Sequence, residues 1–243
     1  KYMYFVANWK MYGNLSSLNT LNKVIKFSKS KEIKKGRLIY CPPYTLISSF
    51  SKKFKNCQIG IGGQNCHESE SYGPYTGYVN SRMLKNIGAQ FVIIGHSENR
   101  EKGENDKLIN LKVKSALEAK LKIIFCIGET LREKRKNMTQ SILSKQIKIG
   151  LEGIKKKSDI FIAYEPVWAI GTGIIPKSKD LLKTVEFIKS KFKDKMPKVL
   201  YGGSVNPQNI KNLKEINNID GFLIGGASQN TNKFIDIVKK TYT

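Results

Sequence analysis

The sequence predicts an α/β protein folded as a single (β/α)8 barrel, with eight parallel strands inside an outer ring of helices. Eight short apolar runs recur along the 243 residues, and amphipathic helical patterns separate them. The runs lack the alternation of apolar and polar residues that marks a half-exposed strand, so we expect parallel strands covered on both faces. Because no proline- or serine-rich linker interrupts the series, residues 1–243 are expected to form one domain.

The predicted strands are rich in β-branched and aromatic residues, which favour extended backbone. In chain order they are Tyr4–Ala7, Leu38–Cys41, Ile59–Gly62, Phe91–Ile94, Ile123–Ile127, Ile160–Tyr164, Val199–Tyr201 and Phe222–Ile224. The alternative architecture is an open doubly wound sheet. It is disfavoured because no G-x-G-x-x-G motif follows the first strand.

The predicted helices are marked by apolar residues that recur every three or four positions. One such stripe covers residues 181–192, and Ser178 is expected as the N-cap of its helix. Asn206 and Pro207 supply an N-cap and a first helical residue for a helix that follows the seventh strand. Helices thus alternate with strands, as the barrel requires.

Basic residues dominate the charge. Lys and Arg number 43 against 19 Asp and Glu, which gives a formal net charge of +24. Such a balance suggests nucleic-acid binding, because contacts that neutralise phosphates contribute affinity. The lysines are spread along every amphipathic segment instead of being gathered in one arm, so we expect no dedicated nucleic-acid binding. A positive field does speed the approach of small phosphorylated anions.

The four cysteines form neither a metal-binding pattern nor a disulfide framework. Cys41, Cys57, Cys66 and Cys126 include no C-x-x-C pair and have no neighbouring histidine cluster. We therefore expect no metal and a reducing, cytoplasmic compartment. No apolar window of about 18 residues is present for a membrane span. His67 is expected to be an exposed loop residue.

The segment 163–173, AYEPVWAIGTG, is the most specific signal in the chain. It places Glu165 where the strand Ile160–Tyr164 ends, before a stiff Pro-Val-Trp hinge and a tip punctuated by glycine. A carboxylate beside a flexible loop with an aromatic anchor suits a general base that must be covered and dried during the reaction.

Residues that directly follow the strands of a (β/α)8 barrel face its active site. Besides Glu165, these positions carry Asn8 and Lys10, then His96, Ser97 and Glu98, then Gly202–Ser204, and finally Gly225 and Gly226. Taken singly, they would be explained as a loop amide, a solvated amine, a structural histidine and turn glycines. Their occurrence at one barrel mouth favours a catalytic site.

This set of residues fits the aldose–ketose isomerisation of a small phosphorylated sugar. Glu165 can take a proton from the carbon next to a carbonyl, and His96 can donate a hydrogen bond to the developing enediolate oxygen. Lys10 supplies positive charge to that oxygen and to the phosphate, and Asn8 orients Lys10. Backbone N–H groups can hold the phosphate at Gly171, Ser204, Gly225 and Gly226. This chemistry needs neither a metal nor an organic cofactor.

The whole chain resembles the triosephosphate isomerase family, after which the TIM barrel is named. The motifs that carry the resemblance are Asn8–Met11, Gly63–Cys66, Tyr75–Gly77, Gly95–Glu98, the segment 163–173, Tyr201–Val205 and Gly225–Ala227. It implies interconversion of dihydroxyacetone phosphate and D-glyceraldehyde 3-phosphate in glycolysis and gluconeogenesis. It makes Glu165 the base, His96 the neutral electrophile and Lys10 the electrostatic stabiliser. This family is itself a standard example of a histidine kept neutral by a helix N-terminus and of a lid that excludes water.

The resemblance also implies a homodimer. In it, the loop around Tyr75-Thr76-Gly77 reaches into the neighbouring subunit and supports its Asn8 and Lys10, with Thr76 as a supporting residue. Ser97 and Glu98 are further supporting residues. The family places Glu98 near Lys10, as an ion-pair partner or as a member of a proton relay, and we favour the plain salt bridge.

Two positions depart together from the family pattern. The family usually has an acidic residue after the Thr-Gly of this loop and an arginine after His-Ser-Glu, whereas this chain has Tyr78 and Asn99. In the family, these two charged residues can pair across the subunit boundary. Because both are replaced here, no buried charge is left without a partner. We expect Tyr78 to maintain the association by apolar contact. The alternative is that it is merely an exposed loop aromatic.

The trailing hinge of the lid departs as well. Gly173 is followed by Ile174-Ile175-Pro176, a shorter stretch than many relatives have before their proline. Proline fixes φ and restricts the residue before it, so we expect the trailing pivot to be displaced or stiffened. The leading hinge Pro166–Trp168 is intact, which predicts that the lid still closes.

Two other functions compete with the isomerase hypothesis. One is a barrel that acts on another small phosphorylated carbonyl compound, which the intact lid disfavours because in the family it closes over a three-carbon substrate. The other is a basic nucleic-acid-binding protein on a barrel scaffold, in which Glu165 would be expendable. The retained catalytic set favours the isomerase.

Overall fold

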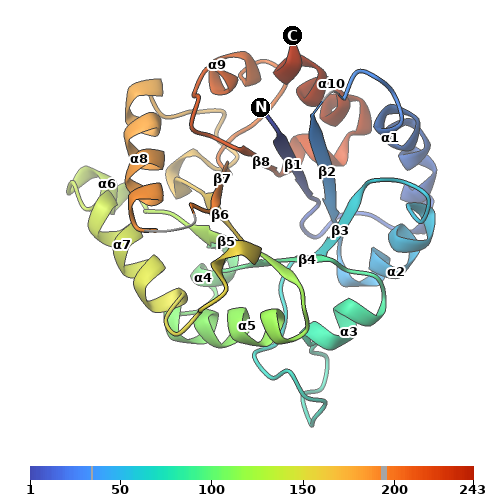
Figure 1. Cartoon of the computed structure of the whole chain (residues 1–243), viewed down its shortest axis with the longest axis horizontal. Coiled ribbons are helices and arrows are strands. Elements are labelled where there is room, and N and C mark those ends of the chain that lie inside the picture. The colour runs from blue at the N-terminus through green and yellow to red at the C-terminus, as the bar shows by residue number, and fades with distance from the viewer. Residues whose placement is uncertain (34, 193–195) are drawn as a thin grey trace.

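Eight parallel strands close into a barrel in the computed structural model of the chain, which describes residues 1–33, 35–192 and 196–243 (Figure 1). The strands are β1 (Met3–Asn8), β2 (Gly36–Cys41), β3 (Gly60–Gly63), β4 (Phe91–Ile94), β5 (Lys122–Ile127), β6 (Ile160–Tyr164), β7 (Lys198–Tyr201) and β8 (Gly221–Ile224). Each strand pairs with the next, and β1 closes the ring against β8, with Val6 in register with both Ile39 and Leu223.

The helices form a ring outside the strands, as Figure 1 shows. They are α1 (Leu21–Ser28), α2 (Tyr44–Lys53), α3 (Ser81–Asn86), α4 (Ser97–Glu101), α5 (Asp106–Glu118), α6 (Leu131–Arg135), α7 (Thr139–Gly150), α8 (Ser178–Ser190), α9 (Ile210–Lys214) and α10 (Thr231–Tyr242). Short 3-10 turns are η1 (Leu15–Thr20), η2 (Lys157–Asp159), η3 (Val167–Ala169) and η4 (Gly226–Gln229). The alternation of strand and helix confirms the predicted fold class.

Both faces of the strands are buried, which explains their apolar character. In β5, Ile124 and Cys126 belong to the cluster that fills the barrel, whereas Ile123 and Phe125 pack in the layer between strands and helices. Burying a side chain of this size stabilises the fold by roughly 1.5–3 kcal/mol relative to leaving it exposed. The buried positions of such a strand therefore favour apolar residues on both faces, whereas Lys122 at its start is exposed.

Neither of the two predicted N-caps occupies the N-cap position of its helix. Lys177 occupies the N-cap position of α8 and Ser178 is the first helical residue, so the prediction for Ser178 is wrong. Its hydroxyl is already inside the first turn, where it makes no capping hydrogen bond. Asn206 does cap a turn, because its Oδ1 accepts hydrogen bonds of 2.9 Å from the backbone N–H groups of Gln208 and Asn209. The helix itself begins at Ile210 with Asn209 at the N-cap position, so the predictions of Asn206 as its N-cap and Pro207 as its first residue are wrong.

The loop between β3 and α3 projects from the barrel (Figure 1), and it buries His67. This side chain is only 8% exposed, so the expectation of an exposed residue is wrong. Its ring lies 4.2 Å from that of Tyr75 and 5.0 Å from that of Tyr78, measured between centroids. The loop folds back on itself through a 2.8 Å hydrogen bond from His67 N–H to the Val79 carbonyl. A polar stretch of sequence gave no sign of this local packing.

The cysteines are all free thiols, and Cys41, Cys66 and Cys126 are buried. Burial raises the pKa of the Cys66 thiol to about 12. Within the described ranges, no group of three or more histidine, cysteine, aspartate or glutamate side chains could hold a metal ion. None of the helices in those ranges combines the length and the apolar character that a membrane span needs.

Candidate active site

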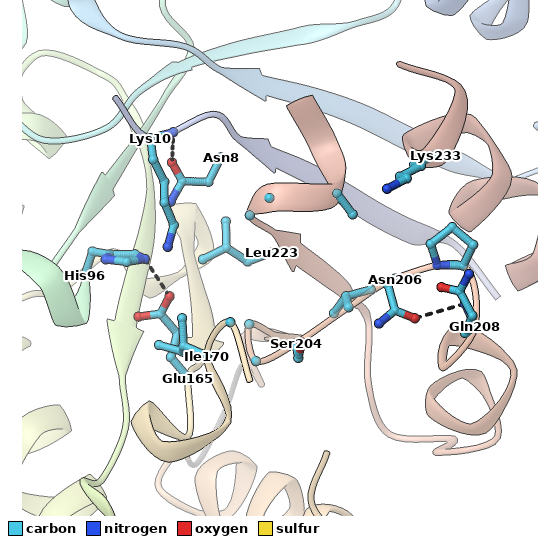
Figure 2. A pocket seen from close by; sticks show the side chains of 18 residues that line it. Asn8, Lys10, His96, Glu165, Ile170, Ser204, Asn206, Gln208, Leu223 and Lys233 are labelled. Atoms are coloured by element: carbon cyan, nitrogen blue, oxygen red, sulfur yellow. Dashed lines mark hydrogen bonds and ion pairs between the residues drawn. The ribbon is translucent and has the colours of Figure 1, made fainter. Parts of the chain in front are cut away.

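A cavity of about 330 Å³ opens at the carboxyl ends of the strands (Figure 2). Because the strands are parallel, the residues that follow them converge at this end of the barrel. The cavity brings together every residue predicted to be catalytic or to bind substrate, namely Asn8, Lys10, His96, Glu165, Gly171, Ser204, Gly225 and Gly226. Ser97 and Glu98 lie beside it and contact Glu165 and Lys10, respectively.

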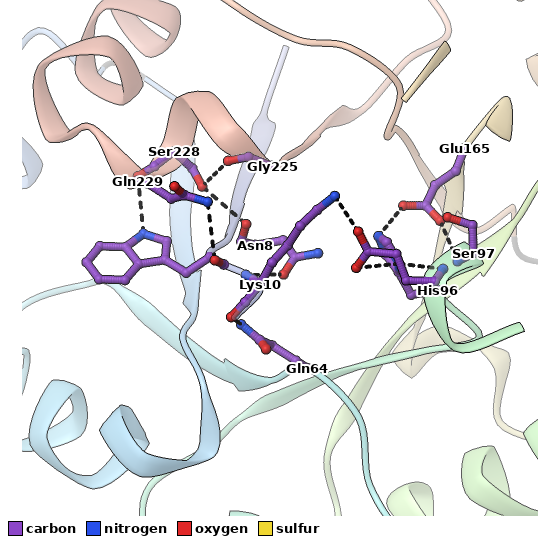
Figure 3. Close-up of polar contacts among 11 residues, drawn as sticks. Asn8, Lys10, Gln64, His96, Ser97, Glu165, Gly225, Ser228 and Gln229 are labelled. Carbon is purple, nitrogen blue, oxygen red and sulfur yellow. Dashed lines mark hydrogen bonds and ion pairs between the residues drawn. The ribbon is translucent and has the colours of Figure 1, made fainter. Parts of the chain in front are cut away.

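Lys10 has a left-handed backbone conformation, with φ at +53°. Such a conformation costs on the order of 1–3 kcal/mol in a residue other than glycine and persists only where neighbours impose it. Asn8 Oδ1 accepts a 3.0 Å hydrogen bond from Lys10 N–H, and Gln64 Nε2 donates one of 2.8 Å to the Lys10 carbonyl (Figure 3). Trp9, on the opposite side of the chain, is anchored by a 3.1 Å bond to the Ser228 carbonyl. These contacts direct the Lys10 side chain into the cavity.

The Lys10 ammonium is paired with Glu98 at 2.7 Å. Partial burial of Glu98 opposes ionisation, but the hydrogen bond from Lys10 together with the positive charges of His96 and Lys10 lowers the pKa of the carboxyl. Glu98 is more than half exposed, so this ion pair contributes little stability and mainly positions the lysine.

His96 and Glu165 form the most deeply buried polar contact of the cavity. Nε2 of His96 lies 2.9 Å from Glu165 Oε1, and both side chains are almost fully buried. Nδ1 of His96 accepts a 3.2 Å hydrogen bond from Glu98 N–H, so the ring proton of a neutral imidazole must sit on Nε2 and face Glu165. Burial alone would lower the pKa of His96, but attraction to the Glu165 carboxylate raises it above its ordinary value.

Close backbone approaches fix the position of Glu165. A Cβ at Gly128 would lie 1.7 Å from the Glu165 carbonyl oxygen, and a Cβ at Gly202 would lie 2.8 Å from Glu165 Cγ. Only glycine fits at either position. A 3.3 Å hydrogen bond from Ser97 N–H reaches Glu165 Oε2. Glu165 is thus held between the ends of β5 and β7 with its carboxylate toward His96.

The lid contacts the barrel at its leading hinge and at its tip. At the leading end, Trp168 Nε1 donates a 3.2 Å hydrogen bond to Glu129, a buried carboxylate that also accepts a 3.0 Å bond from the Tyr164 hydroxyl. The Lys134 ammonium lies 3.4 Å from the centre of the Trp168 ring. At the tip, Gly173 N–H donates a 3.1 Å bond to Ser204 Oγ. The lid therefore bridges the loops that follow β5 and β7.

The family model for triosephosphate isomerase matches residues 3–241. The chain belongs to the triosephosphate isomerase family. The isomerase of Thermodesulfovibrio yellowstonii is 41% identical over 97% of this chain and 98% of its own length, and that of Aquifex aeolicus is 38% identical over 96% of both. The crystal structure of the isomerase from Bartonella henselae superposes with a TM-score of 0.90 at 36% identity, covering 99% of each chain.

Thr76 is the predicted site residue that the fold does not bring to the cavity. It is exposed on the loop that contains Tyr75 and Gly77. A separate cavity of about 350 Å³ lies beside Lys10, between Tyr44 and Asn99. Thr76 lines neither cavity in the described part of the chain, and the space next to Lys10 is unfilled by those residues.

Sequence reasoning missed Gln64 and Glu129 as residues of the site of this isomerase. Both follow a strand closely: Gln64 comes directly after β3, and Glu129 comes two residues after β5. The rule that found Glu165, applied to the third and fifth strands, would have found them. Gln64 acts on the site by binding the Lys10 backbone, and Glu129 acts on it by holding the leading hinge of the lid.

Proposed function

We propose that this triosephosphate isomerase interconverts dihydroxyacetone phosphate and D-glyceraldehyde 3-phosphate through an enediolate, with Glu165 as the base. One observation carries the proposal. The buried Glu165 carboxylate contacts His96 at 2.9 Å in the same cavity as Lys10 and the glycine-rich loops after β7 and β8. Base, hydrogen-bond donor, cation and phosphate-binding backbone are then all within reach of one three-carbon substrate.

The proton moves between two neighbouring carbons. Glu165 removes a proton from the carbon next to the carbonyl, which leaves an enediolate. The hydroxyl proton of the enediolate moves from one oxygen to the other, and the resulting acid returns a proton to the adjacent carbon. Nε2–H of His96 donates to the oxygen on which negative charge develops, and the Lys10 ammonium stabilises the same charge. Asn8 orients Lys10 through its backbone. The carboxylate is regenerated at the end, and the scheme uses no metal or cofactor.

His96 acts as a neutral donor in this scheme. Its Nδ1 accepts from Glu98 N–H, as a neutral ring with its proton on Nε2 does. The Glu165 carboxylate raises the pKa of His96 while the two groups touch. A substrate placed between them removes that contact and so favours the neutral ring. The family is a standard example of a neutral histidine in this role.

The phosphate is held by backbone N–H groups of Gly171, Ser204, Gly225 and Gly226. Backbone donors suit an oxyanion because they need no rearrangement when it binds. Gly171 has φ at +69°, which favours glycine at the tip of the lid. The bond between Gly173 and Ser204 would then close the lid over the bound phosphate and exclude water.

The functional unit is a homodimer. The projecting loop, with exposed Tyr75 and Thr76, would enter the cavity beside Lys10 of the partner subunit and support Asn8 and Lys10 there. Glu98 acts as the ion-pair partner of Lys10, as its 2.7 Å contact supports. We also propose a cytoplasmic location, which rests on the cysteine pattern of the sequence alone.

The test is a coupled assay of glyceraldehyde 3-phosphate conversion with wild type, Glu165→Gln and, as a control, Glu186→Gln on the exposed face of α8. Loss of the general base should lower kcat about 10²–10⁴-fold, whereas Glu186→Gln should retain wild-type turnover. Full activity in a correctly folded Glu165→Gln variant would overturn the proposal. Inactive wild type that retains DNA in a salt-dependent manner would favour the nucleic-acid alternative.

A further inference from the structure

We propose that the active-site cavity contains a second anion subsite, formed by Lys233, Asn206 and Gln208. It would take the second phosphate group of a compound whose first phosphate occupies the backbone donors at Ser204 and Gly226. The location of that first phosphate rests on the proposed function. A triose phosphate carries one phosphate, so the subsite is not needed for turnover and makes small bisphosphates or pyrophosphate competitive ligands.

The three residues lie at the end of the cavity away from the chemistry. Figure 2 shows Lys233, Asn206 and Gln208 on the far side of Ser204 from His96 and Glu165, and all of them line the same cavity. Lys233 is in the first turn of α10, which follows β8 after the short turn η4, and it lines the cavity at the mouth of the barrel. An extended dianion could thus span from the phosphate donors to this end.

Lys233 differs from the other lysines on α10. Lys239 pairs with Glu32 at 2.7 Å and Lys240 pairs with Asp236 at 2.9 Å. Lys233 has no carboxylate within ion-pair distance in the described part of the chain, although it lines a cavity. Among the residues that line this cavity in those ranges, the single carboxylate is Glu165, at the opposite end. The outer end is therefore positively charged and open to an anion.

Asn206 presents amide hydrogens because its oxygen is already occupied. Oδ1 accepts from the backbone N–H groups of Gln208 and Asn209, at 2.9 Å each. Two donors facing one end of the amide fix which end is oxygen, so the NH₂ group must point away from them. No hydrogen bond to an acceptor is made by this NH₂ group within the described ranges. It is available as a neutral donor beside the Lys233 ammonium.

The loop that carries these donors is held in place by hydrogen bonds within the chain. Asn209 accepts a 2.9 Å bond from Asn206 N–H through Oδ1 and donates one of 2.9 Å to the Ser204 carbonyl through Nδ2. Lys240 on α10 donates a 3.3 Å bond to the Pro207 carbonyl, which ties the loop to the helix of Lys233. Pre-organised donors lose little entropy on binding, which favours a specific subsite over a diffuse positive surface.

The test measures the binding of pyrophosphate and of orthophosphate by calorimetry in wild type, Lys233→Gln and Lys148→Gln. Lys148 is an exposed lysine in the last turn of α7, at the other end of the barrel, so it controls for the loss of one charge. The ratio of pyrophosphate to orthophosphate affinity should fall about tenfold in Lys233→Gln, the effect of one hydrogen bond to a charged group. It should be unchanged in Lys148→Gln.

Asn206→Asp is a second variant, since a carboxylate keeps the acceptor for the turn and replaces the NH₂ donor by negative charge. It should lower the same ratio at least as much as Lys233→Gln. An unchanged ratio in Lys233→Gln would overturn the subsite, as would pyrophosphate binding that does not compete with orthophosphate. Calorimetry measures binding without turnover. If the protein were inactive on triose phosphates while its pyrophosphate affinity still depended on Lys233, the subsite would be supported and the proposed function would be refuted.

Discussion

Single residues of the site owe their properties to contacts with other elements. His96 is in contact with Glu165 on one ring nitrogen and with a backbone N–H on the other, so the surroundings fix its tautomer. Glu165 owes its orientation to the absence of a side chain at Gly128 and Gly202. Lys10 keeps a left-handed backbone because Asn8 and Gln64 bind both of its peptide groups. A small change at a neighbour should therefore act on catalysis.

The first prediction concerns the pH dependence of stability. The pKa of His96 is raised above its ordinary 6.5 in the fold. A raised pKa means that the protonated form is stabilised, so its contribution is fully present below the unfolded pKa and is lost as pH rises through the folded pKa. The loss of unfolding free energy caused by His96→Gln should be larger at about pH 5.5 than at about pH 9. Urea unfolding at both pH values checks this, and a larger loss at the higher pH would contradict it.

The second prediction concerns Gly128. An alanine Cβ would lie 1.7 Å from the Glu165 carbonyl oxygen, so Gly128→Ala must shift the backbone of the base. We expect kcat to fall about 10²-fold, with a loss of stability of roughly 1–3 kcal/mol. Gly150→Ala is the control, because its Cβ meets the Phe125 ring away from the site. Turnover and urea unfolding of both variants separate the effects; equal losses of kcat would refute the prediction.

Elements combine a rigid support with a segment that can move. The lid continues directly from β6, and the buried Glu129 holds its leading hinge at Trp168. The trailing hinge ends at Pro176, which is buried two residues before α8 begins. Between these anchors the tip is exposed and contacts the barrel through Ser204. This arrangement allows the tip to move while both hinges stay fixed.

The third prediction concerns the tip of the lid. Ser204→Ala removes the acceptor for Gly173 N–H and leaves the backbone donor of residue 204 in place. A lost hydrogen bond of about 0.5–1.5 kcal/mol should raise KM twofold to tenfold and speed chymotryptic cleavage after Trp168. Glycerol phosphate should protect residues 168–174 in wild type and protect them less in the variant. Failure of the ligand to protect wild type would show that the lid does not close.

The whole molecule leaves apolar side chains uncovered on its projecting loop and beside Lys10. Tyr78 is 66% exposed although one edge of its ring packs against His67, and Tyr75 is 46% exposed. Met11, next to Lys10 in the sequence, is 92% exposed. In the homodimer that we propose, a partner would cover these side chains, and Tyr78 would replace a charge by apolar contact area. That residues 1–243 act as one domain stays a prediction.

The fourth prediction concerns this assembly. Sedimentation at micromolar protein should show a dimer, and Tyr78→Ala should weaken it by roughly 1–3 kcal/mol, the cost of truncating a buried aromatic anchor. Leu131→Ala, an exposed apolar residue on α6, serves as the matched control and should leave the dimer intact. A monomer in wild type at that concentration would refute the role proposed for Tyr78.

The sequence by itself determined the barrel and the membership of the site. Eight apolar runs predicted the eight strands, with the bounds of β4 and β6 correct to the residue, and the strand-end rule gathered Asn8, Lys10, His96 and Glu165 before any contact was known. These properties follow from local patterns, because burial of both strand faces and the position after a strand are written in consecutive residues.

Only the tertiary structure decided how these residues act on one another. The Glu165–His96 contact, the Glu129 anchor of Trp168 and the burial of His67 each join segments whose spacing depends on packing. The subsite that we propose joins a loop after β7 to a lysine on α10 in the same way. Distances of a few ångströms between side chains depend on barrel closure and on excluded volume at Gly128 and Gly202. Those are properties of the closed barrel, which no local pattern of residues encodes.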